Sequence, residues 1–304
     1  MTQLLNALPG ALAQGLIWGV MAIGVYITYK VLDIADLTVD GSICTGAAVC
    51  TMLLLGGQSP WLALLCAVLA GVLAGAVTGL LHVGLGIPPI LAGILTQMVL
   101  WSVNLKLLGK ANQALPARTT PVLLSQMDVG GALPVLLGFC VVLVALLVLF
   151  FGTELGCALR ATGCNPVMSR AQGVNTGLMK VVGLALSNGV VALSGALLCQ
   201  YQGYTDVNMG RGAVVIGLAA VVIGQAVLGR WGGRMAVQLG GVILGAVIYY
   251  IVYQVIIFAG FDTDLLKMFS AVVVAVFLGA PHVKAQLKAH SRSKKGDSGH
   301  AENE

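Results

Sequence analysis

Long stretches of this chain carry no charged side chain. Residues 41–105 contain no Asp, Glu, Lys or Arg. Further uncharged windows cover 129–153, 181–205, 212–229, 235–261 and 268–283. Because about 20 apolar residues cross the hydrocarbon core of a bilayer, each window is about one crossing long or a multiple of one. Charged residues make up only 9% of the chain, against roughly 25% in soluble domains. The sequence therefore predicts an all-α, polytopic membrane helical bundle.

Nine helical spans are expected from these windows. They cover residues 9–29, 38–55, 60–82, 88–108, 131–151, 177–199, 212–228, 235–259 and 265–280. The second span is short enough to be a broken or re-entrant helix. All nine belong to one transmembrane domain, residues 1–282. The polar tail 283–304 has nothing to bury and is expected to be disordered in the cytoplasm.

The distribution of basic residues predicts the orientation, because Lys and Arg in short loops stay in the cytoplasm. With the C-terminus inside, eleven basic residues lie in inner loops. Only five lie in outer loops, namely Lys106, Lys110, Arg118, Arg211 and Lys267. An odd number of spans then places the N-terminus outside. No basic residue precedes the first span, unlike a cleaved signal peptide, so this span is expected to be retained.

The inner loop 152–180 is predicted to form a compact helix–turn–helix element. Asn165 and Pro166 suit the start of a second short helix, with Asn as the cap and Pro at the first position. Short apolar faces are predicted from Leu159, Met168, Ala171 and Val174. Such an element either docks with a partner or lies as an amphipathic linker on the lipid headgroups.

This loop carries the pattern G-x-x-L-R-A-x-G-x-N-P-x-x-x-R-A-x-G-V-N, followed by LALSNGVVALSGALLCQYQGYTDVNMGRG. With LDIADLTVDGS at 32–42 and IPPILAGILTQMVLWSVNLKLLGKAN at 87–112, it resembles the permeases of the branched-chain amino acid and ribose group of ABC importers. The resemblance is closest to permeases linked to tryptophan or tyrosine import, and it covers most of the chain. Ribose-type members often have an additional N-terminal span, which leaves a count of eight to ten open.

The resemblance implies a membrane-spanning subunit of an ATP-driven importer in a bacterial inner membrane. Its implied partners are a separate ATP-binding subunit, an extracytoplasmic substrate-binding protein, a second permease copy in a homodimer and the lipid bilayer, with no nucleic acid. The coupling surface toward the ATPase would comprise Arg160, Ala161, Gly163, Asn165, Pro166, Arg170, Ala171 and Gly173. The chain has no G-x-x-x-x-G-K-[ST] phosphate loop, so it is expected to hold no cofactor, with ATP and Mg²⁺ on the partner. The resemblance implies a small solute of the amino acid type, with an aromatic amino acid as one candidate.

Polar residues within or beside the spans are candidates for lining a translocation pathway, because polar groups in a bilayer usually face the bundle interior. They are Asp40, Gln97, Asn104, Asn188, Gln200, Asp206 and Asn208. Alternatively, Asp33, Asp36 and Asp40 could cap the second span, and Gln97, Asn104 and Asn188 could form interhelical hydrogen bonds. The stretch 200–212 is expected to be irregular, with Tyr201, Tyr204 and Met209 as an outer gate or as interface anchors.

Two other classes of protein were weighed. An ion-coupled secondary transporter typically uses ionisable groups near the midplane, and the middle of every assigned span lacks Asp, Glu, Lys and Arg. An intramembrane enzyme would need a catalytic or metal constellation, whereas the four His are scattered. The seven Cys include no C-x-x-C pair, so no metal site is expected. Glycine pairs such as Gly71 with Gly75 and Gly241 with Gly245 indicate close helix packing.

Overall fold

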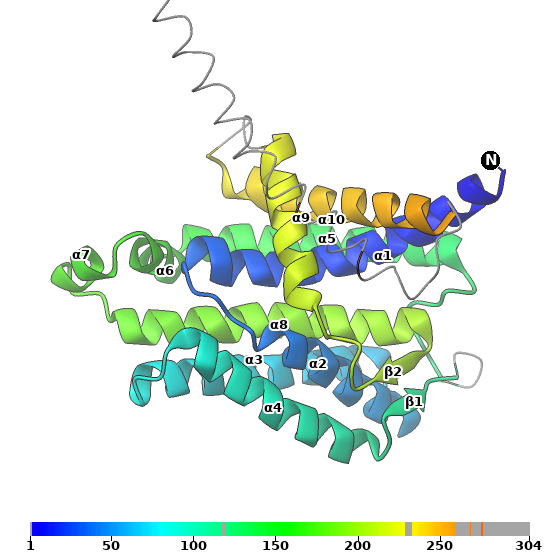
Figure 1. Ribbon diagram of the computed structural model, residues 1–304, viewed down its shortest axis with the longest axis horizontal. Helices are drawn as coiled ribbons and strands as arrows, with labels where there is room; N and C mark the ends of the chain where they lie inside the picture. The colour runs from blue at the N-terminus through cyan, green and yellow to red at the C-terminus, as the bar shows by residue number, and fades with distance from the viewer. Residues whose placement is uncertain (1, 117–119, 229–232, 259–267, 269–274, 276–304) are drawn as a thin grey trace, which may run out of the picture.

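The computed structural model describes residues 2–116, 120–228, 233–258, 268 and 275, with only the backbone for residues 2–6. These residues form ten α-helices, one π-helical turn and two short strands (Figure 1). The elements are α1 (Thr2–Tyr26), η1 (Ile27–Val31), α2 (Val39–Leu55), α3 (Pro60–Gly84), α4 (Pro89–Leu108), β1 (Asn112–Ala114), α5 (Val129–Gly152), α6 (Glu154–Cys164), α7 (Pro166–Ala171), α8 (Thr176–Gln202), β2 (Tyr204–Asp206), α9 (Ala213–Leu228) and α10 (Met235–Phe258).

The prediction of a polytopic helical membrane bundle is confirmed. Six described helices are long and apolar enough to cross a membrane, and α2 and α9 are shorter apolar helices. These eight match the first eight predicted spans to within a few residues, apart from the start of α1. The ninth predicted span, 265–280, falls almost entirely outside the described residues, as does the tail 283–304. The only strands described, β1 and β2, form one antiparallel pair in which Asn112 is opposite Asp206.

Local capping explains why the long helices begin where they do. Ser59 caps α3 through the backbone N–H of Leu62, and Pro60 follows at the first helical position. Asp128 accepts from Gly131 N–H at the start of α5. Asn175 accepts from Leu178 N–H at the start of α8. Each side chain satisfies a donor that the first turn of a helix leaves free.

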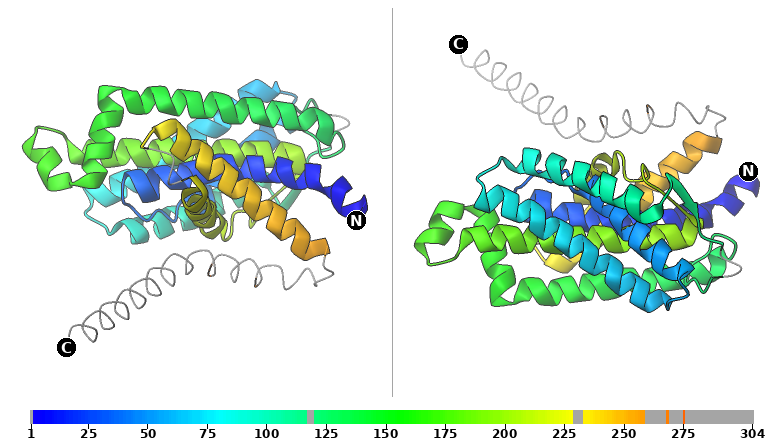
Figure 2. Two further views of the ribbon diagram at one scale, coloured as in Figure 1. Left: turned by 90° about the horizontal axis from the view of Figure 1, so that it is seen from above. Right: turned by 90° about the horizontal axis from the view of Figure 1, so that it is seen from below.

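Helix α8 is the central element of the bundle. Figures 1 and 2 show it running between α1 and α3. A Cβ atom on Gly71 would collide with the carbonyl oxygen of Asn188, and one on Gly75 with that of Leu184. The backbones of α3 and α8 therefore approach more closely than any larger residue allows, which agrees with the packing interpretation of this glycine pair. Gly245 of α10 similarly meets the Ala220 carbonyl of α9.

Helix α2 begins in the middle of the bundle rather than at its end. Its first turn contacts Asn188, which lies about halfway along α8, through the hydroxyl of Ser42. Between η1 and α2 the chain contains a non-helical stretch in which the Ile34 N–H bonds to the Thr28 carbonyl. Irregular backbone at membrane depth is tolerated where protein surrounds it. The second span is therefore short, as expected, but it is one continuous helix from Val39 to Leu55 and is not broken.

Helix α9 also begins inside the bundle and then crosses the other helices (Figure 1). It contacts α1 where Gly217 meets Val25, and α10 where Gly224 meets the Gly241 carbonyl. The segment 200–212 that leads to it, which was expected to be irregular, is irregular only in part. Helix α8 continues through Gln202, and the left-handed Gly203 ends it before β2.

Candidate functional site

The first turns of the two shorter apolar helices, α2 and α9, meet inside the bundle. Asp40 in the first turn of α2 accepts hydrogen bonds of 3.0 Å from the backbone N–H groups of Gly212 and Val214. The sequence left two roles open for Asp40, either capping its own helix or lining the translocation pathway. In the structure it caps α9 instead, because the chain that leads to α9 passes directly over α2. Gly210 lies so close that a Cβ atom there would collide with the Asp40 carbonyl.

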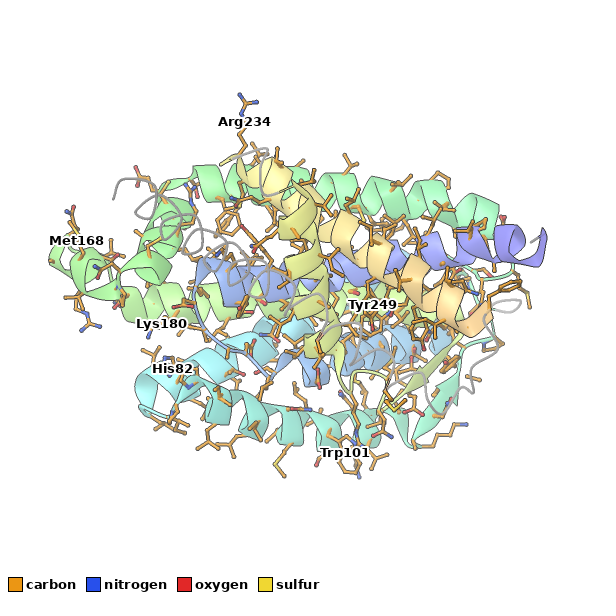
Figure 3. The ribbon with its side chains drawn as sticks, turned by 45° about the horizontal axis from the view of Figure 1, so that its top comes forward. His82, Trp101, Met168, Lys180, Arg234 and Tyr249 are labelled. Carbon is orange, nitrogen blue, oxygen red and sulfur yellow. The ribbon has the colours of Figure 1, made fainter. Side chains whose placement is uncertain are left out.

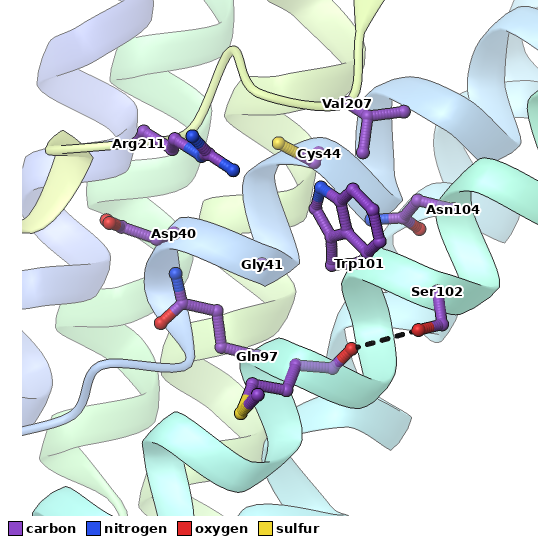
Figure 4. A pocket seen from close by; sticks show the side chains of 10 residues that line it. Asp40, Gly41, Cys44, Gln97, Trp101, Ser102, Asn104, Val207 and Arg211 are labelled. Carbon is purple, nitrogen blue, oxygen red and sulfur yellow. Dashed lines mark hydrogen bonds between the residues drawn. The ribbon is translucent and has the colours of Figure 1, made fainter. Parts of the chain in front are cut away.

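A cavity of about 560 Å³ opens beside this junction. Side chains from three parts of the chain line it, including Asp40, Cys44, Gln97, Trp101, Asn104 and Arg211 (Figure 4). Three of the predicted pathway residues, Asp40, Gln97 and Asn104, are thus brought together. Small-molecule sites have volumes of roughly 300–1,000 Å³, so this cavity is large enough for a small solute.

One face of α4 provides most of one wall. Gln97, Trp101 and Asn104 lie four and three residues apart, which places them on the same side of a helix. Asn104 is only 1% exposed, and neither its amide nitrogen nor its amide oxygen has a hydrogen-bond partner. A buried polar group without a partner is unfavourable by about 1–3 kcal/mol. Interhelical bonding, the alternative role of Asn104, is therefore not observed.

Arg211, which the charge count assigned to an outer loop, lies in the loop between β2 and α9 and lines this cavity. It precedes α9 and lines the cavity with Asp40 (Figure 4). Among the described residues, no carboxylate forms an ion pair with it within 4.0 Å. The sequence analysis missed Arg211, Trp101 and Cys44 as lining residues. The helical spacing of Trp101 from Gln97 and Asn104, and of Cys44 from Asp40, was a signal that could have found two of them.

Asn188 belongs to a separate buried polar network. Its Nδ2 donates to Asp36 Oδ2 at 2.7 Å, and its Oδ1 accepts from Ser42 Oγ at 2.6 Å. Asp36 Oδ1 also accepts from the Thr38 N–H at 2.8 Å. A chain of hydroxyls from Thr38 through Thr78 to Thr96 extends the network to α3 and α4. Asn188 thus makes the interhelical bonds that were one of its two expected roles.

This network corrects one step of the sequence argument. Asp36 is buried at the level of Asn188, halfway along α8, and Asp40 lies one helical turn further along the chain. The middle of every assigned span does lack acidic residues. Because the second span begins at the level of Asn188, Asp36 and Asp40 nevertheless lie about halfway along the bundle. Among the described residues, the Asp33 side chain caps no helix. Asp33 adopts a left-handed backbone with φ of 55°, which Asp tolerates better than most residues.

The remaining predicted pathway residues lie nearer the β1–β2 end of the molecule. Gln200 Oε1 accepts from the Leu123 N–H, which ties α8 to the segment before α5. Asn208 lines a second cavity of about 740 Å³ that also includes Arg211, Trp18 and Tyr249. Asp206 pairs with Asn112 and with the Asn208 N–H. Tyr201 is buried, whereas Tyr204 is exposed and Met209 half-buried.

The predicted helix–turn–helix element is present at the opposite end, where α6 and α7 protrude from the bundle (Figure 1). Asn165 Oδ1 accepts from the Val167 and Met168 N–H groups, and Pro166 occupies the first position of α7. The cap prediction is confirmed. Leu159 is fully buried against the bundle, but Val167 is 78% and Met168 62% exposed. Figure 3 shows Met168 at the far tip of the element.

Seven of the eight predicted coupling residues are exposed, and Gly163 is half-buried. The exposed residues are Arg160, Ala161, Asn165, Pro166, Arg170, Ala171 and Gly173. Arg160 donates to the Phe151 carbonyl at the end of α5, and Arg170 donates to Thr176 Oγ1 at the start of α8. Gly163 faces inward, since a Cβ atom there would collide with the Val31 carbonyl of η1. Gly163 therefore joins the element to the first span.

A basic pair at the same end connects α3 with α8. Lys180 Nζ lies 3.3 Å from His82 Nε2, and His82 Nδ1 lies 2.8 Å from the Ile87 carbonyl. Figure 3 shows both side chains in this region. Among the described residues, no group of three or more His, Cys, Asp and Glu side chains is placed to hold a metal ion.

These features define a multi-pass helical membrane protein in which two shorter helices meet beside a polar cavity of solute size. Residues 8–280 match the family described as branched-chain amino acid transport system, permease component, and the chain belongs to that family. This confirms the resemblance drawn from the sequence motifs.

Individual relatives agree with this assignment. The chain is 37% identical over 287 residues to the tyrosine transport system permease protein of Clostridioides difficile, covering 93% of this chain and 94% of the relative. It is 33% identical to the uncharacterized protein RP368 of Rickettsia prowazekii, covering 91% and 98%. It is 29% identical to the autoinducer 2 import system permease protein LsrC of Escherichia coli, covering 67% and 60%. No solved structure matches the chain significantly.

Proposed function

We propose that this permease is the membrane-spanning subunit of an ATP-driven importer of an amino acid. The protruding element α6–α7 is the main observation behind the proposal. Its framework is fixed by the Asn165 cap, the Arg160 bond to Phe151 and the Arg170 bond to Thr176. A short, rigid element of this kind can transmit a movement of a partner to the helices that it joins.

The exposed tip of α7 gives the partner a surface to bind. Val167 and Met168 project from the protein, and exposed apolar side chains favour a protein or lipid contact. The partner that we propose is a separate ATP-binding subunit, which would carry ATP and Mg²⁺. We further propose an extracytoplasmic binding protein that delivers the solute and a homodimer of permeases. The proposed membrane is the bacterial inner membrane, with α6–α7 and the C-terminus in the cytoplasm.

An amino acid is the proposed solute because the tyrosine transport permease matches this chain over nearly its full length. The alternative of an ion-coupled secondary transporter needs no second polypeptide for uptake. The two therefore differ in whether uptake requires ATP and a partner that binds α7.

Reconstitution in proteoliposomes tests this proposal. The permease, its ATP-binding subunit and its binding protein should take up tritiated L-tyrosine only when ATP reaches the ATPase. Met168→Glu should reduce this uptake at least about tenfold and weaken co-purification of the ATPase, because a charge at the tip opposes burial in an apolar contact. Met127→Glu is the matched control, since Met127 is also exposed but lies before α5, at the opposite end of that helix from α6.

Uptake that continues without ATP would contradict the proposal and favour the secondary transporter. If Met168→Glu takes up tyrosine and binds the ATPase normally, α7 is not part of the coupling surface.

A further inference from the structure

The cavity beside Asp40 contains two opposite charges that do not neutralise each other. Asp40 and Arg211 both line it, yet Arg211 has no ion-pair partner within 4.0 Å among the described residues. Ionisable groups within a membrane protein normally pair with one another or line a polar path. An unpaired carboxylate and guanidinium on one cavity match a ligand that carries both charges.

Asp40 retains the capacity to bind such a ligand. A carboxylate offers about four acceptor positions. The backbone N–H groups of Gly212 and Val214 donate to it at 3.0 Å, and the Ala213 N–H also interacts with it. These bonds also hold the carboxylate in place. An ammonium group in the cavity could therefore bind Asp40 without breaking the cap of α9.

Asn104 provides an independent sign of a missing ligand. Its side chain is almost fully buried, lines the same cavity and has no partner for either amide atom. Such a group in a native structure calls for a water or a ligand that binds it. An amide can both donate to a carboxylate and accept from an ammonium or hydroxyl group.

The α4 wall of the cavity also carries apolar and aromatic side chains beside Gln97 and Asn104. Trp101 and Met98 of α4 line it, and Trp101 is 44% exposed. Figure 4 shows the Trp101 indole between Cys44 and Asn104 at the cavity. An indole face stacks well on another ring, and the volume of about 560 Å³ leaves room for one.

We infer that this cavity is a binding site for an aromatic α-amino acid zwitterion within the permease itself. Asp40 binds the ammonium group, Arg211 binds the carboxylate, and Trp101 contacts the side chain. Arg211 also lines the second cavity, so the site lies next to a further space through which the solute can move. The inference rests on the proposed function and extends it to the residues that recognise the solute.

Binding to the full-length permease in nanodiscs, without ATPase or binding protein, tests the site. The probe is tritiated L-tyrosine, with tyramine and 3-(4-hydroxyphenyl)propionate as competitors that lack the carboxylate and the ammonium group, respectively. Arg211→Gln should weaken L-tyrosine and the propionate at least about tenfold, since a hydrogen bond to a charged group contributes about 1.5–3 kcal/mol. It should leave tyramine unchanged. Asp40→Asn should show the opposite selectivity, weakening L-tyrosine and tyramine but not the propionate.

Two control variants test whether the changes in ligand binding are specific to the site. Lys106→Gln removes an exposed charge from the last turn of α4, and Trp61→Leu removes an exposed Trp from α3. Both should bind L-tyrosine like the wild type, whereas Trp101→Leu should bind it several-fold more weakly. Equal losses for all three ligands in Arg211→Gln would indicate a structural role and overturn the inference.

The binding experiment and the uptake experiment can fail independently of each other. ATP-driven tyrosine uptake by a permease that shows no saturable tyrosine binding would overturn the site and leave the function intact. Saturable, charge-selective binding without any ATP-driven uptake would support the site and refute the proposed function.

Discussion

Two carboxylates four residues apart illustrate how much depends on partners that are distant in sequence. Asp36 accepts a hydrogen bond from the side-chain amide of Asn188, which lies 152 residues away in the sequence. Asp40 accepts hydrogen bonds from the backbone N–H groups of Gly212 and Val214, which lie more than 170 residues away in the sequence. The cost of burying a charge makes it predictable that both need partners. Which groups supply them follows only from the packing of α2 against α8 and α9.

Asn188→Leu should destabilise the permease more than the loss of an ordinary interhelical hydrogen bond. The change leaves Asp36 Oδ2 and the Ser42 hydroxyl without their partner in a buried region. A lost bond to a charged group corresponds to about 1.5–3 kcal/mol. Ser194 lies on the same helix as Asn188 and donates to the Ile17 carbonyl of α1. Ser194→Ala should lower the free energy of unfolding by only about 0.6 kcal/mol, the average for interhelical hydrogen bonds in membranes.

Unfolding of both variants in the same detergent measures the difference. Equal free energies of unfolding for Asn188→Leu and Ser194→Ala would show that Asp36 does not depend on Asn188.

At the scale of elements, the extent of the helices was predictable and their depth was not. Caps such as Ser59 and Asn165, and glycines such as Gly109 and Gly203, mark helix ends in the sequence itself. By contrast, α2 and α9 have ordinary apolar compositions, and nothing in them states that they begin inside the bundle. That position depends on long-range contacts, so Asp40, Gln97 and Asn104 could be predicted as polar candidates but not as one cavity with Arg211.

Helix α7 should depend strongly on its cap, because a helix of six residues has little stability of its own. Asn165→Ala removes the acceptor for the Val167 and Met168 N–H groups, a loss of about 1 kcal/mol. Faster hydrogen exchange in α7 and a severalfold lower rate of ATP-driven uptake are expected. Asn165→Asp, which caps nearly as well, should restore both. Failure of Asp to restore uptake would mean that the amide itself contacts the partner.

At the scale of the whole molecule, the two ends of the bundle differ in character. One end carries α6 and α7 with Arg160, Arg170 and Lys180. The other carries the β1–β2 ribbon and the segment before α5, which includes Asp128. Since basic residues of short loops remain in the cytoplasm, the structure combines with the charge distribution to predict that α6 and α7 face inward.

Cysteine labelling from either side of the membrane tests this orientation. Cys157 and Cys164 are exposed on α6, whereas the other five cysteines are buried or half-buried. An impermeant maleimide should label them in inside-out vesicles but not in intact cells, when the permease is expressed without its ATPase. Met127→Cys, placed in a variant with Cys157→Ser and Cys164→Ser, should show the reverse pattern. Only α5 separates Met127 from α6, so labelling of both sites from the same side would mean that α5 does not cross the membrane. If the maleimide labels Cys157 and Cys164 in intact cells and Met127→Cys in inside-out vesicles, the bundle crosses the membrane in the opposite orientation. Helix α7 could then not reach a cytoplasmic ATPase.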